Sequence, residues 1–390
     1  MLPLLLLALG SLFCRADALG HPPSHKADLK KAGIEALDVY SSGTFLHLLV
    51  ASYEDGKPVL LYQQSLDGAV TWSEFKRIDT NLRPAHSPRR GMDPQIAGSG
   101  DNLVAVWMTG GTDEWGGGPM ATALSHDGGK SWMGGPNPAD DNSTAGHGFI
   151  DIASDAAGVF HLTWLDTRNG KRGLRYARSK DGGRSWEANR TLDPETCECC
   201  WNRIAAGPDG AVAVLYRDSS PRDMRLAIAE EEGKSWKTFP MAPFNWDFQG
   251  CPHVGGGLAF EIATPFLHSF LWTGKEEFAG LYYVSSADLG RSWTKAKQIG
   301  AASASHPDIA TGKAGTVAAV WDEAGESGSS IWASISRDRG QTWKKAARLS
   351  GKSHPAQQPR VVAVADGFRV FWTETSREGV SSLASKMLNP

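Results

Sequence analysis

The chain has 390 residues, with 40 basic and 43 acidic side chains and a sequence pI near 6.4. This balance leaves no positive field to attract a polyanion, and no basic stretch alternates with aromatic residues, so nucleic acid is not an expected partner. The length alone would allow two or three domains. The 44 glycines and 15 tryptophans instead fit a single turn-rich, all-β domain.

The first residues form an apolar segment unlike the rest of the chain. Leu2 to Phe13 is an apolar run, and Ala16-Asp17-Ala18 offers small residues at the usual cleavage spacing. We therefore expect a signal peptide over residues 1–18 and export of a single domain, 19–390, to the periplasm or the medium. A bilayer span needs about 20 apolar residues, so no transmembrane segment is expected. Cys14 leaves a lipoprotein as the alternative, against which the bulky Phe13 argues.

A short motif, S-x-D-x-G-x-[ST]-W, recurs along the chain at a period near 50 residues. Complete copies span 125–132, 179–186, 286–293 and 336–343, and degraded copies span 65–72 and 229–236. A tight turn between antiparallel strands needs glycine where φ is positive and an Asp that bonds its own backbone. This Asp-box motif therefore predicts a fold, and we expect its Asp residues to serve turns rather than catalysis.

A second repeat lies between the Asp boxes. It is a short strand near P-x-[IV]-A followed by an alternating apolar strand that ends in an aromatic residue. Counting a weaker opening copy from Ile34 to Tyr53, the chain has seven units, of which six carry a box. We therefore predict a seven-bladed β-propeller of four-stranded antiparallel blades. The last unit stops before a fourth strand, which the segment from Lys26 to Lys31 could supply.

Four cysteines remain after removal of the predicted signal peptide. Cys197, Cys199 and Cys200 precede the inner strand of the fourth unit, and Cys251 precedes that of the fifth. Neighbouring blades would bring them together on the face opposite the Asp-box turns. Export favours two disulfides, and pairing Cys197 with Cys200 and Cys199 with Cys251 avoids the strained vicinal and C-x-C rings. The other interpretation is a soft-metal site for copper or zinc.

Histidines could complete such a metal site. Five of them fall in loops that lead into inner strands and would face the same mouth: His86, His147, His253, His306 and His354. A loop histidine that only bonds neighbouring backbone is the simpler interpretation for each. His253, two residues after Cys251, is the best candidate ligand.

The Asp boxes, the P-x-[IV]-A strands and the aromatic-ended second strands resemble the sialidase-like, or BNR-repeat, propellers over nearly the whole mature chain. Cys197-Glu198-Cys199-Cys200 and Gly250-Cys251-Pro252-His253 further resemble an exported bacterial subgroup of that superfamily. True sialidases have six blades, so the resemblance implies a six-bladed fold as the alternative. It also implies a possible arginine triad, Tyr nucleophile and Asp acid/base, but the R-I-P motif of the first arginine is absent here.

Charged residues at the ends of second strands could take the place of these sialidase catalytic residues. The candidate catalytic residues are Asp166, Arg168, Arg217, Asp218 and Glu323. They support the hypothesis of an exo-acting glycoside hydrolase on acidic sugars. That hypothesis is the alternative. The main hypothesis is a monomeric binding or assembly module that uses its Cys/His-lined face for a metal ion, a glycan or a protein ligand. Fold analogy alone does not decide between the two.

Overall fold

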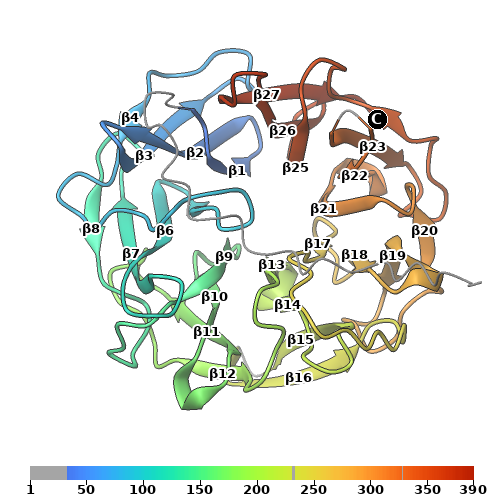
Figure 1. Cartoon of the computed structure of the whole chain (residues 1–390), viewed down its shortest axis with the longest axis horizontal. Helices are drawn as coiled ribbons and strands as arrows, with labels where there is room; N and C mark the ends of the chain where they lie inside the picture. The colour runs from blue at the N-terminus through green and yellow to red at the C-terminus, as the bar shows by residue number, and fades with distance from the viewer. Residues whose placement is uncertain (1–32, 231–232, 327) are drawn as a thin grey trace, which may run out of the picture.

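The computed structural model describes residues 33–230, 233–326 and 328–390, which form seven antiparallel sheets arranged as blades around a central axis (Figure 1). The prediction of seven blades is confirmed, so the chain does not form the six-bladed alternative. The predicted signal peptide and the segment from Lys26 to Lys31 lie outside the described residues. Among the described residues no helix is long and apolar enough to cross a membrane.

Each blade takes its strands in chain order from the axis outward. Blade 1 contains β1 (Ala36–Ser42), β2 (Phe45–Glu54), β3 (Lys57–Ser65) and β4 (Lys76–Arg77). Blade 2 contains β5 (Gln95–Ser99), β6 (Asn102–Gly110), β7 (Gly117–Ser125) and β8 (Met133–Gly135). Blade 3 contains β9 (Gly148–Ser154), β10 (Phe160–Asp166), β11 (Gly173–Ser179) and β12 (Arg190–Asp193). Blade 4 contains β13 (Arg203–Ala206), β14 (Val212–Arg217), β15 (Met224–Glu230) and β16 (Ser235–Pro240).

The remaining blades follow the same plan. Blade 5 contains β17 (Gly257–Phe260), β18 (Leu267–Thr273), β19 (Gly280–Ser286) and β20 (Lys297–Ile299). Blade 6 contains β21 (Ala304–Thr311), β22 (Val317–Glu323), β23 (Ser330–Ser336) and β24 (Ala347–Arg348). Blade 7 has three described strands, β25 (Ala356–Val364), β26 (Gly367–Thr375) and β27 (Ser381–Leu388). Short 3-10 helices lie in the loops, namely η1 (Arg168–Gly170), η2 (Pro208–Gly210), η4 (Glu276–Phe278) and η5 (Lys313–Gly315).

The apolar core is divided among the interfaces between neighbouring blades. Every pair of adjacent blades shares one cluster of buried apolar side chains, and the pair formed by blades 7 and 1 closes the ring. Second strands therefore bury both faces, as in β10 and β14, where every residue is buried. At the closure, Ser41 Oγ donates to the Ala363 carbonyl at 2.6 Å and Ile34 N–H to the Ser381 carbonyl at 3.0 Å.

The Asp boxes form the turns between third and fourth strands, on what we call the bottom face. In the box at 125–132, Ser125 Oγ donates to Asp127 Oδ1 at 2.8 Å, and Asp127 accepts the Ser131 N–H at 2.9 Å. The degraded first box keeps the same bonds, and those from Thr71 and Ser65 lower the pKa of Asp67 to about 2. The box carboxylates are therefore saturated by their own turns, as the sequence predicted.

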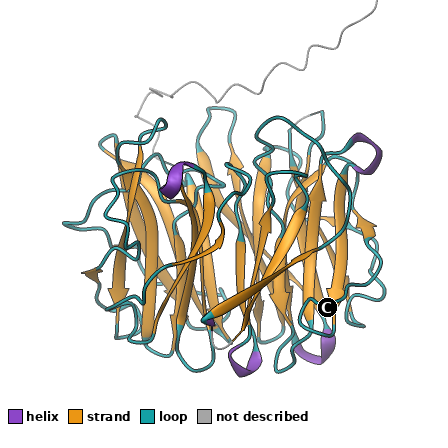
Figure 2. Cartoon of the chain, turned by 90° about the horizontal axis from the view of Figure 1, so that it is seen from below, coloured by secondary structure: helices purple, strands orange, loops and turns teal. Residues whose placement is uncertain are grey.

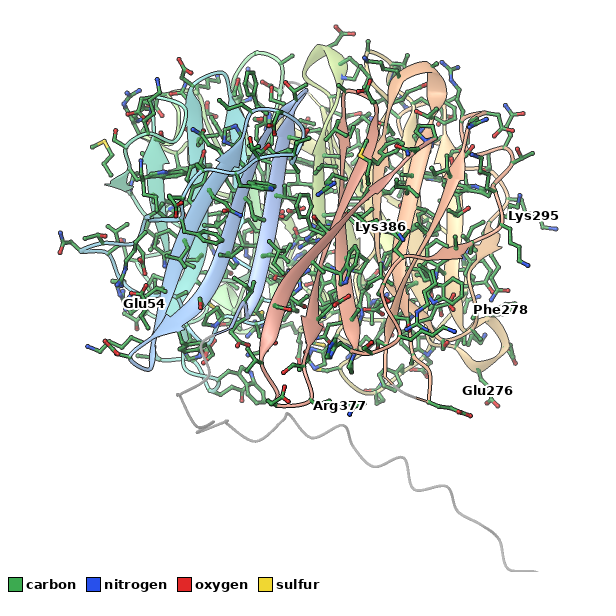
Figure 3. The ribbon with its side chains drawn as sticks, turned by 90° about the horizontal axis from the view of Figure 1, so that it is seen from above. Glu54, Glu276, Phe278, Lys295, Arg377 and Lys386 are labelled. Atoms are coloured by element: carbon green, nitrogen blue, oxygen red, sulfur yellow. The ribbon has the colours of Figure 1, made fainter. Side chains whose placement is uncertain are left out.

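The top face carries the loops that lead into inner strands and those that join second to third strands. The strands run between the two faces, which are seen edge-on in Figure 2. In Figure 3 the top face lies along the lower edge, where Glu276, Phe278 and Arg377 project.

A layer of charged side chains crosses the central channel below this face. Asp38, Asp151 and Asp308, on inner strands, each accept a backbone N–H from the inner strand of the next blade, and burial raises the pKa of all three carboxyls. These bonds are 2.9 Å from Ile96, 2.7 Å from Ile204 and 2.9 Å from Val361. Arg203 and Arg360 occupy the same strand position in blades 4 and 7 and lie among these carboxylates.

Candidate functional site

The four cysteines in the described part of the chain meet on the top face, where the loops leading into blades 4 and 5 come together. Cys197, Cys199 and Cys200 lie in the loop from β12 to β13 and are buried, whereas Cys251 lies half-buried in the long loop from β16 to β17. Cys197 Sγ is 3.1 Å from Cys200 Sγ and 3.9 Å from Cys199 Sγ. The predicted juxtaposition is therefore present, and all four are free cysteines in the structure.

The sulfurs belong to two triads that share one cysteine. The ligand atoms of Cys197, Cys199 and Cys200 all lie within 4.8 Å of one another, as do those of Cys199, Cys251 and His253. We call these five residues the Cys/His cluster. Thiolates bound to a tetrahedral zinc ion at about 2.3 Å stand about 3.8 Å apart, so the spacing within each triad is close to that of ligands of one soft ion.

Positive charge borders the cluster. Arg222, from the loop between β14 and β15, donates through Nη1 to Cys197 Sγ at 3.1 Å and through Nε to the Phe248 carbonyl at 2.7 Å. Hydrogen bonding with the thiols of Cys199 and Cys200, together with the charge of Arg217, lowers the pKa of Cys197. A thiolate is the form that binds a metal ion, so this environment prepares Cys197 as a ligand. The neighbouring thiols and burial instead raise the pKa of Cys199, and burial and the Cys197 thiol raise the pKa of Cys200.

Arg217, the predicted catalytic residue nearest the cysteines, clamps the loop that carries Cys251. Its side chain is fully buried and donates to the Val254 carbonyl at 3.1 Å, the Trp272 carbonyl at 2.9 Å and the Arg222 carbonyl at 2.6 Å. The guanidinium also lies 5.5 Å from the ring centroids of Trp246 and Trp272. Its donors are thus directed at protein carbonyls, which makes it part of the support of the cluster.

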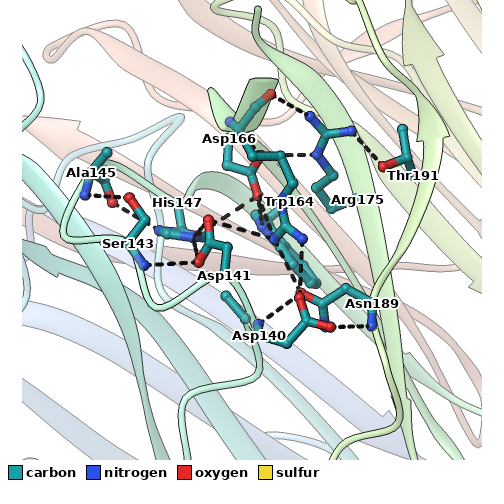
Figure 4. A network of polar contacts seen from close by, with 12 residues as sticks. Asp140, Asp141, Ser143, Ala145, His147, Trp164, Asp166, Arg175, Asn189 and Thr191 are labelled. Atoms are coloured by element: carbon teal, nitrogen blue, oxygen red, sulfur yellow. Dashed lines mark hydrogen bonds and ion pairs between the residues drawn. The ribbon is translucent and has the colours of Figure 1, made fainter. Parts of the chain in front are cut away.

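Asp166 lies in a separate, largely buried network in blade 3 (Figure 4), and the half-buried Arg168 is one of its partners. Asp166 Oδ2 accepts from Arg168 Nε and Trp164 Nε1, both at 2.9 Å, and Oδ1 accepts from Arg175 Nε at 2.9 Å. Burial opposes ionisation, but the bonds from Arg168 and Arg175 prevail and lower the pKa of Asp166. The structure brings this predicted pair together, with the carboxylate bonded to side chains of three residues and to the Arg168 backbone N–H.

A buried histidine borders the same network. His147 has its Nδ1 2.8 Å from the Ala145 carbonyl and its Nε2 3.1 Å from Asp141 Oδ1 (Figure 4). Asp141, His147 and Asp166 also lie within 4.8 Å of one another. Arg168 already neutralises both carboxylates, at 3.8 Å from Asp141 and 2.8 Å from Asp166. The chemistry of this group is that of an ion-pair network.

The other predicted catalytic residues have different partners. Asp218 pairs with Arg225 at 3.1 Å, and Glu323 Oε1 accepts from Trp321 Nε1 at 2.8 Å and from the Ala301 N–H at 3.0 Å. Among the described residues, neither side chain forms a hydrogen bond or an ion pair with the side chain of Asp166 or Arg217. The rim is therefore divided among blades 3, 4 and 6, and a catalytic role for its members stays a prediction.

The five predicted loop histidines do not form one ring of ligands. His253 joins the cysteines, His86 Nε2 lies 2.9 Å from the Trp115 carbonyl, and His306 Nδ1 lies 2.8 Å from Asp322 Oδ2. Sequence reasoning missed Arg222 as a neighbour of the cysteines, because only the fold brings its loop to them. It also missed the charged channel layer, although the aligned P-x-[IV]-A repeats carry Asp151, Arg203, Asp308 and Arg360 at their variable position.

Solved structures with the same fold place the chain among β-propellers. An ulvan lyase, described as a new polysaccharide lyase family, has a TM-score of 0.62 at 10% identity, over 92% of this chain and 94% of that one. A protein of unknown function from Dyadobacter fermentans has a TM-score of 0.55 at 14% identity, over 92% and 95%. A Hadza microbial sialidase has a TM-score of 0.51 at 14% identity, over 89% and 74%.

These identities support the fold and leave the activity open. The β-propeller fold is confirmed and is shared with a sialidase and a polysaccharide lyase, whereas membership of the sialidase-like superfamily and of its exported subgroup stays a prediction. No protein-family model matches the sequence. No curated protein matches it either.

Proposed function

We propose that the protein is an exported binding module that holds a soft metal ion, Zn(II) or Cu(I), in the Cys/His cluster. Cys199 is the central ligand, because it belongs to both triads. Cys197 and Cys200 supply thiolates from the buried side, and Cys251 and His253 supply ligands from the half-buried side. Thiolates and imidazole are the ligands that soft and borderline ions prefer.

The observation that carries this proposal is the convergence of four free thiols and one imidazole from two loops of neighbouring blades. Buried thiolates repel one another, so a cluster of this kind is stable as an anion only with a compensating cation. Arg222 and Arg217 supply part of that charge. A bound ion would supply the rest and would join the two loops, because its ligands come from both.

The test measures metal and thiols on one sample. The chain is exported, purified without chelator, and assayed for zinc and copper by mass spectrometry and for free thiols by a colorimetric reagent. We expect a stoichiometric ion, lost in Cys199→Ser and strongly reduced in Cys251→Ser. His86→Gln, a top-face histidine outside the cluster, is the matched control and should retain the ion.

The outcomes separate the competing interpretations. Substitution by Co(II), followed by its visible absorption, reports tetrahedral thiolate coordination and supports a zinc-like site. Copper bound only under reducing conditions supports Cu(I). A protein without metal and without free thiols, also after reconstitution, overturns the proposal in favour of the disulfides Cys197–Cys200 and Cys199–Cys251.

The glycoside hydrolase hypothesis on acidic sugars stays the alternative. Its support is the fold shared with a sialidase and a polysaccharide lyase. Turnover of a fluorogenic sialoside or an aryl uronide, abolished by Asp218→Asn in a folded protein, would favour it over a binding module.

A further inference from the structure

A cavity opens at the mouth of the central channel, beside the Cys/His cluster and above the charged layer. It encloses about 570 Å³, counting the space open to solvent at its mouth. Its walls come from the loop between blades 1 and 2 and from blades 2, 3, 4, 6 and 7. They include Phe149, Trp201, Arg203, His306, Gln358 and Arg360.

The backbone is strained where it directs three of these side chains toward the cavity. Phe149, His306 and Gln358 have φ of +53°, +51° and +49°, which is left-handed backbone that such side chains rarely adopt. Each lies at a β-bulge between the first two strands of its blade. Bulges re-aim side chains, and strain of this kind gathers at functional sites. Three blades carry the same costly feature at the same place, which points to the cavity as a site.

The cavity has buried polar groups that lack protein partners. The Arg203 and Arg360 side chains are only 11% and 12% exposed. Among the described residues neither guanidinium makes a hydrogen bond within 3.5 Å, and the nearest carboxylate oxygens lie at 3.6 to 3.8 Å. The Nε atoms of both arginines and Gln358 Oε1 are buried without a partner. Buried donors and acceptors need partners, so oxygen atoms of a ligand or of water belong here.

The balance of charge decides which oxygen-rich ligand fits. Arg90, Arg203 and Arg360 are offset by carboxylates of the channel layer and by Asp93, which is 2.5 Å from Arg90. Four carboxyls, those of Asp38, Asp93, Asp151 and Asp308, face three arginines, so the charges still balance when burial keeps Asp38 protonated. No surplus positive charge is left for an anion. Closely spaced donors and acceptors instead match hydroxyl groups, which both donate and accept.

An aromatic wall supplies the apolar part of the cavity. Trp201 stacks on His306 with ring centroids 5.5 Å apart and an interplanar angle of 27°, and Asp322 fixes the His306 ring through Nδ1. Phe149 lines the cavity and also contacts the cysteines. Aromatic surface with a few placed polar groups is the usual composition of a small-ligand site.

We propose that this cavity binds a neutral sugar unit, whose hydroxyls meet Arg203, Arg360 and Gln358 and whose ring lies against the aromatic wall. The site is distinct from the Cys/His cluster and does not depend on a metal being bound there. It is also distinct from the predicted acidic-sugar rim, because it uses none of those residues and has no excess positive charge.

The test is binding of methyl glycosides of neutral hexoses to the full mature protein, followed by tryptophan fluorescence and calorimetry. The free acids glucuronate and sialic acid are measured alongside. We expect at least one neutral glycoside to bind, and Gln358→Ala to weaken it about tenfold or more, because one buried hydrogen bond of this kind is worth roughly a factor of ten. His86→Gln, on the same face but outside the cavity, should leave the affinity unchanged.

Trp201→Leu provides a second variant, which should weaken binding and remove the fluorescence change. Melting curves establish that each variant is folded. Tighter binding of the acids, binding that Gln358→Ala and Trp201→Leu leave unchanged, or no binding by any neutral glycoside would each overturn the proposal. Repeating the titration after metal removal separates this outcome from that of the proposed metal site.

Discussion

The bottom and top faces of this propeller are built from the same seven repeats but follow opposite rules. On the bottom face, successive Asp boxes make the same hydrogen bonds, from Ser125 to Asp127 as from Ser336 to Asp338, and their carboxylates are satisfied locally. On the top face each loop differs, and the buried guanidiniums of Arg203 and Arg360 have an Nε without a partner. Repetition therefore builds the scaffold, and departures from repetition build the candidate sites.

The largest expected effect comes from a top-face residue that the structure assigns to the scaffold. Asp166→Ala removes the carboxylate that Arg168 and the buried Arg175 share. Arg168 keeps Asp140 and Asp141, but the buried Arg175 guanidinium loses its carboxylate partner. Breaking a buried ion pair costs about 3 to 5 kcal/mol, so the free energy of unfolding in urea should fall by that amount. Glu323→Ala, a half-exposed rim residue, is the comparison and should cost far less. Equal losses in the two variants would contradict the assignment.

Buried histidines that support the bottom face predict a dependence on pH. Burial lowers the pKa of His47 and of His268 to about 4, and each contacts a tyrosine that packs on an Asp-box tryptophan. Below pH 6.5, the ordinary pKa of histidine, these two histidines bind protons in the unfolded chain. In the folded chain they bind protons only near pH 4. The stabilisation is therefore complete above pH 6.5 and is lost as the pH falls toward 4, by roughly 3 kcal/mol per histidine.

Unfolding in urea across that pH window measures the effect. His47→Gln should make the pH dependence shallower, because it removes one of the two groups that titrate differently in the folded and unfolded chains. His86→Gln, which lacks a buried tyrosine partner, should keep the wild-type slope. An unchanged slope in His47→Gln would show that other groups govern acid stability.

Two glycines of one Asp box separate backbone strain from packing. Gly128 and Gly129 both have positive φ, 71° and 86°, but a Cβ on Gly129 would overlap Tyr62 Oη, whereas one on Gly128 meets nothing closer than 3.4 Å. Gly129→Ala should therefore cost about 2 to 3 kcal/mol, against about 1 kcal/mol for Gly128→Ala. Thermal melts of the two variants test the difference. The first box carries Ala69 at this position with φ of 70°, and its Trp72 packs on Phe371 of blade 7.

The propeller fold could be predicted because each repeat contains the residues that its Asp-box turn requires. The position of the cysteines on the face opposite those turns could be predicted from the order of strands and loops in each repeat. The contacts of individual side chains did not follow. Arg217 stood at the end of a second strand like any rim charge, and nothing local indicated that its donors would reach carbonyls on a loop 37 residues away at Val254. His306 and Gln358 were likewise invisible as strained residues, since a bulge leaves no clear pattern in one sequence.

The smallest expected change in stability gives the sharpest contrast between the faces. Gln358→Gly removes a left-handed glutamine and a buried acceptor without a partner, so the free energy of unfolding should rise by about 0.5 to 1 kcal/mol. The same variant should lose affinity for the neutral glycoside, because its amide lines the cavity. Melting and titration of one sample check both. A gain in stability with unchanged binding would mean that this strain serves only the bulge. A gain in stability together with a loss of binding would show that the strained backbone at Gln358 is retained for a ligand. We expect no Asp-box residue to combine these two effects.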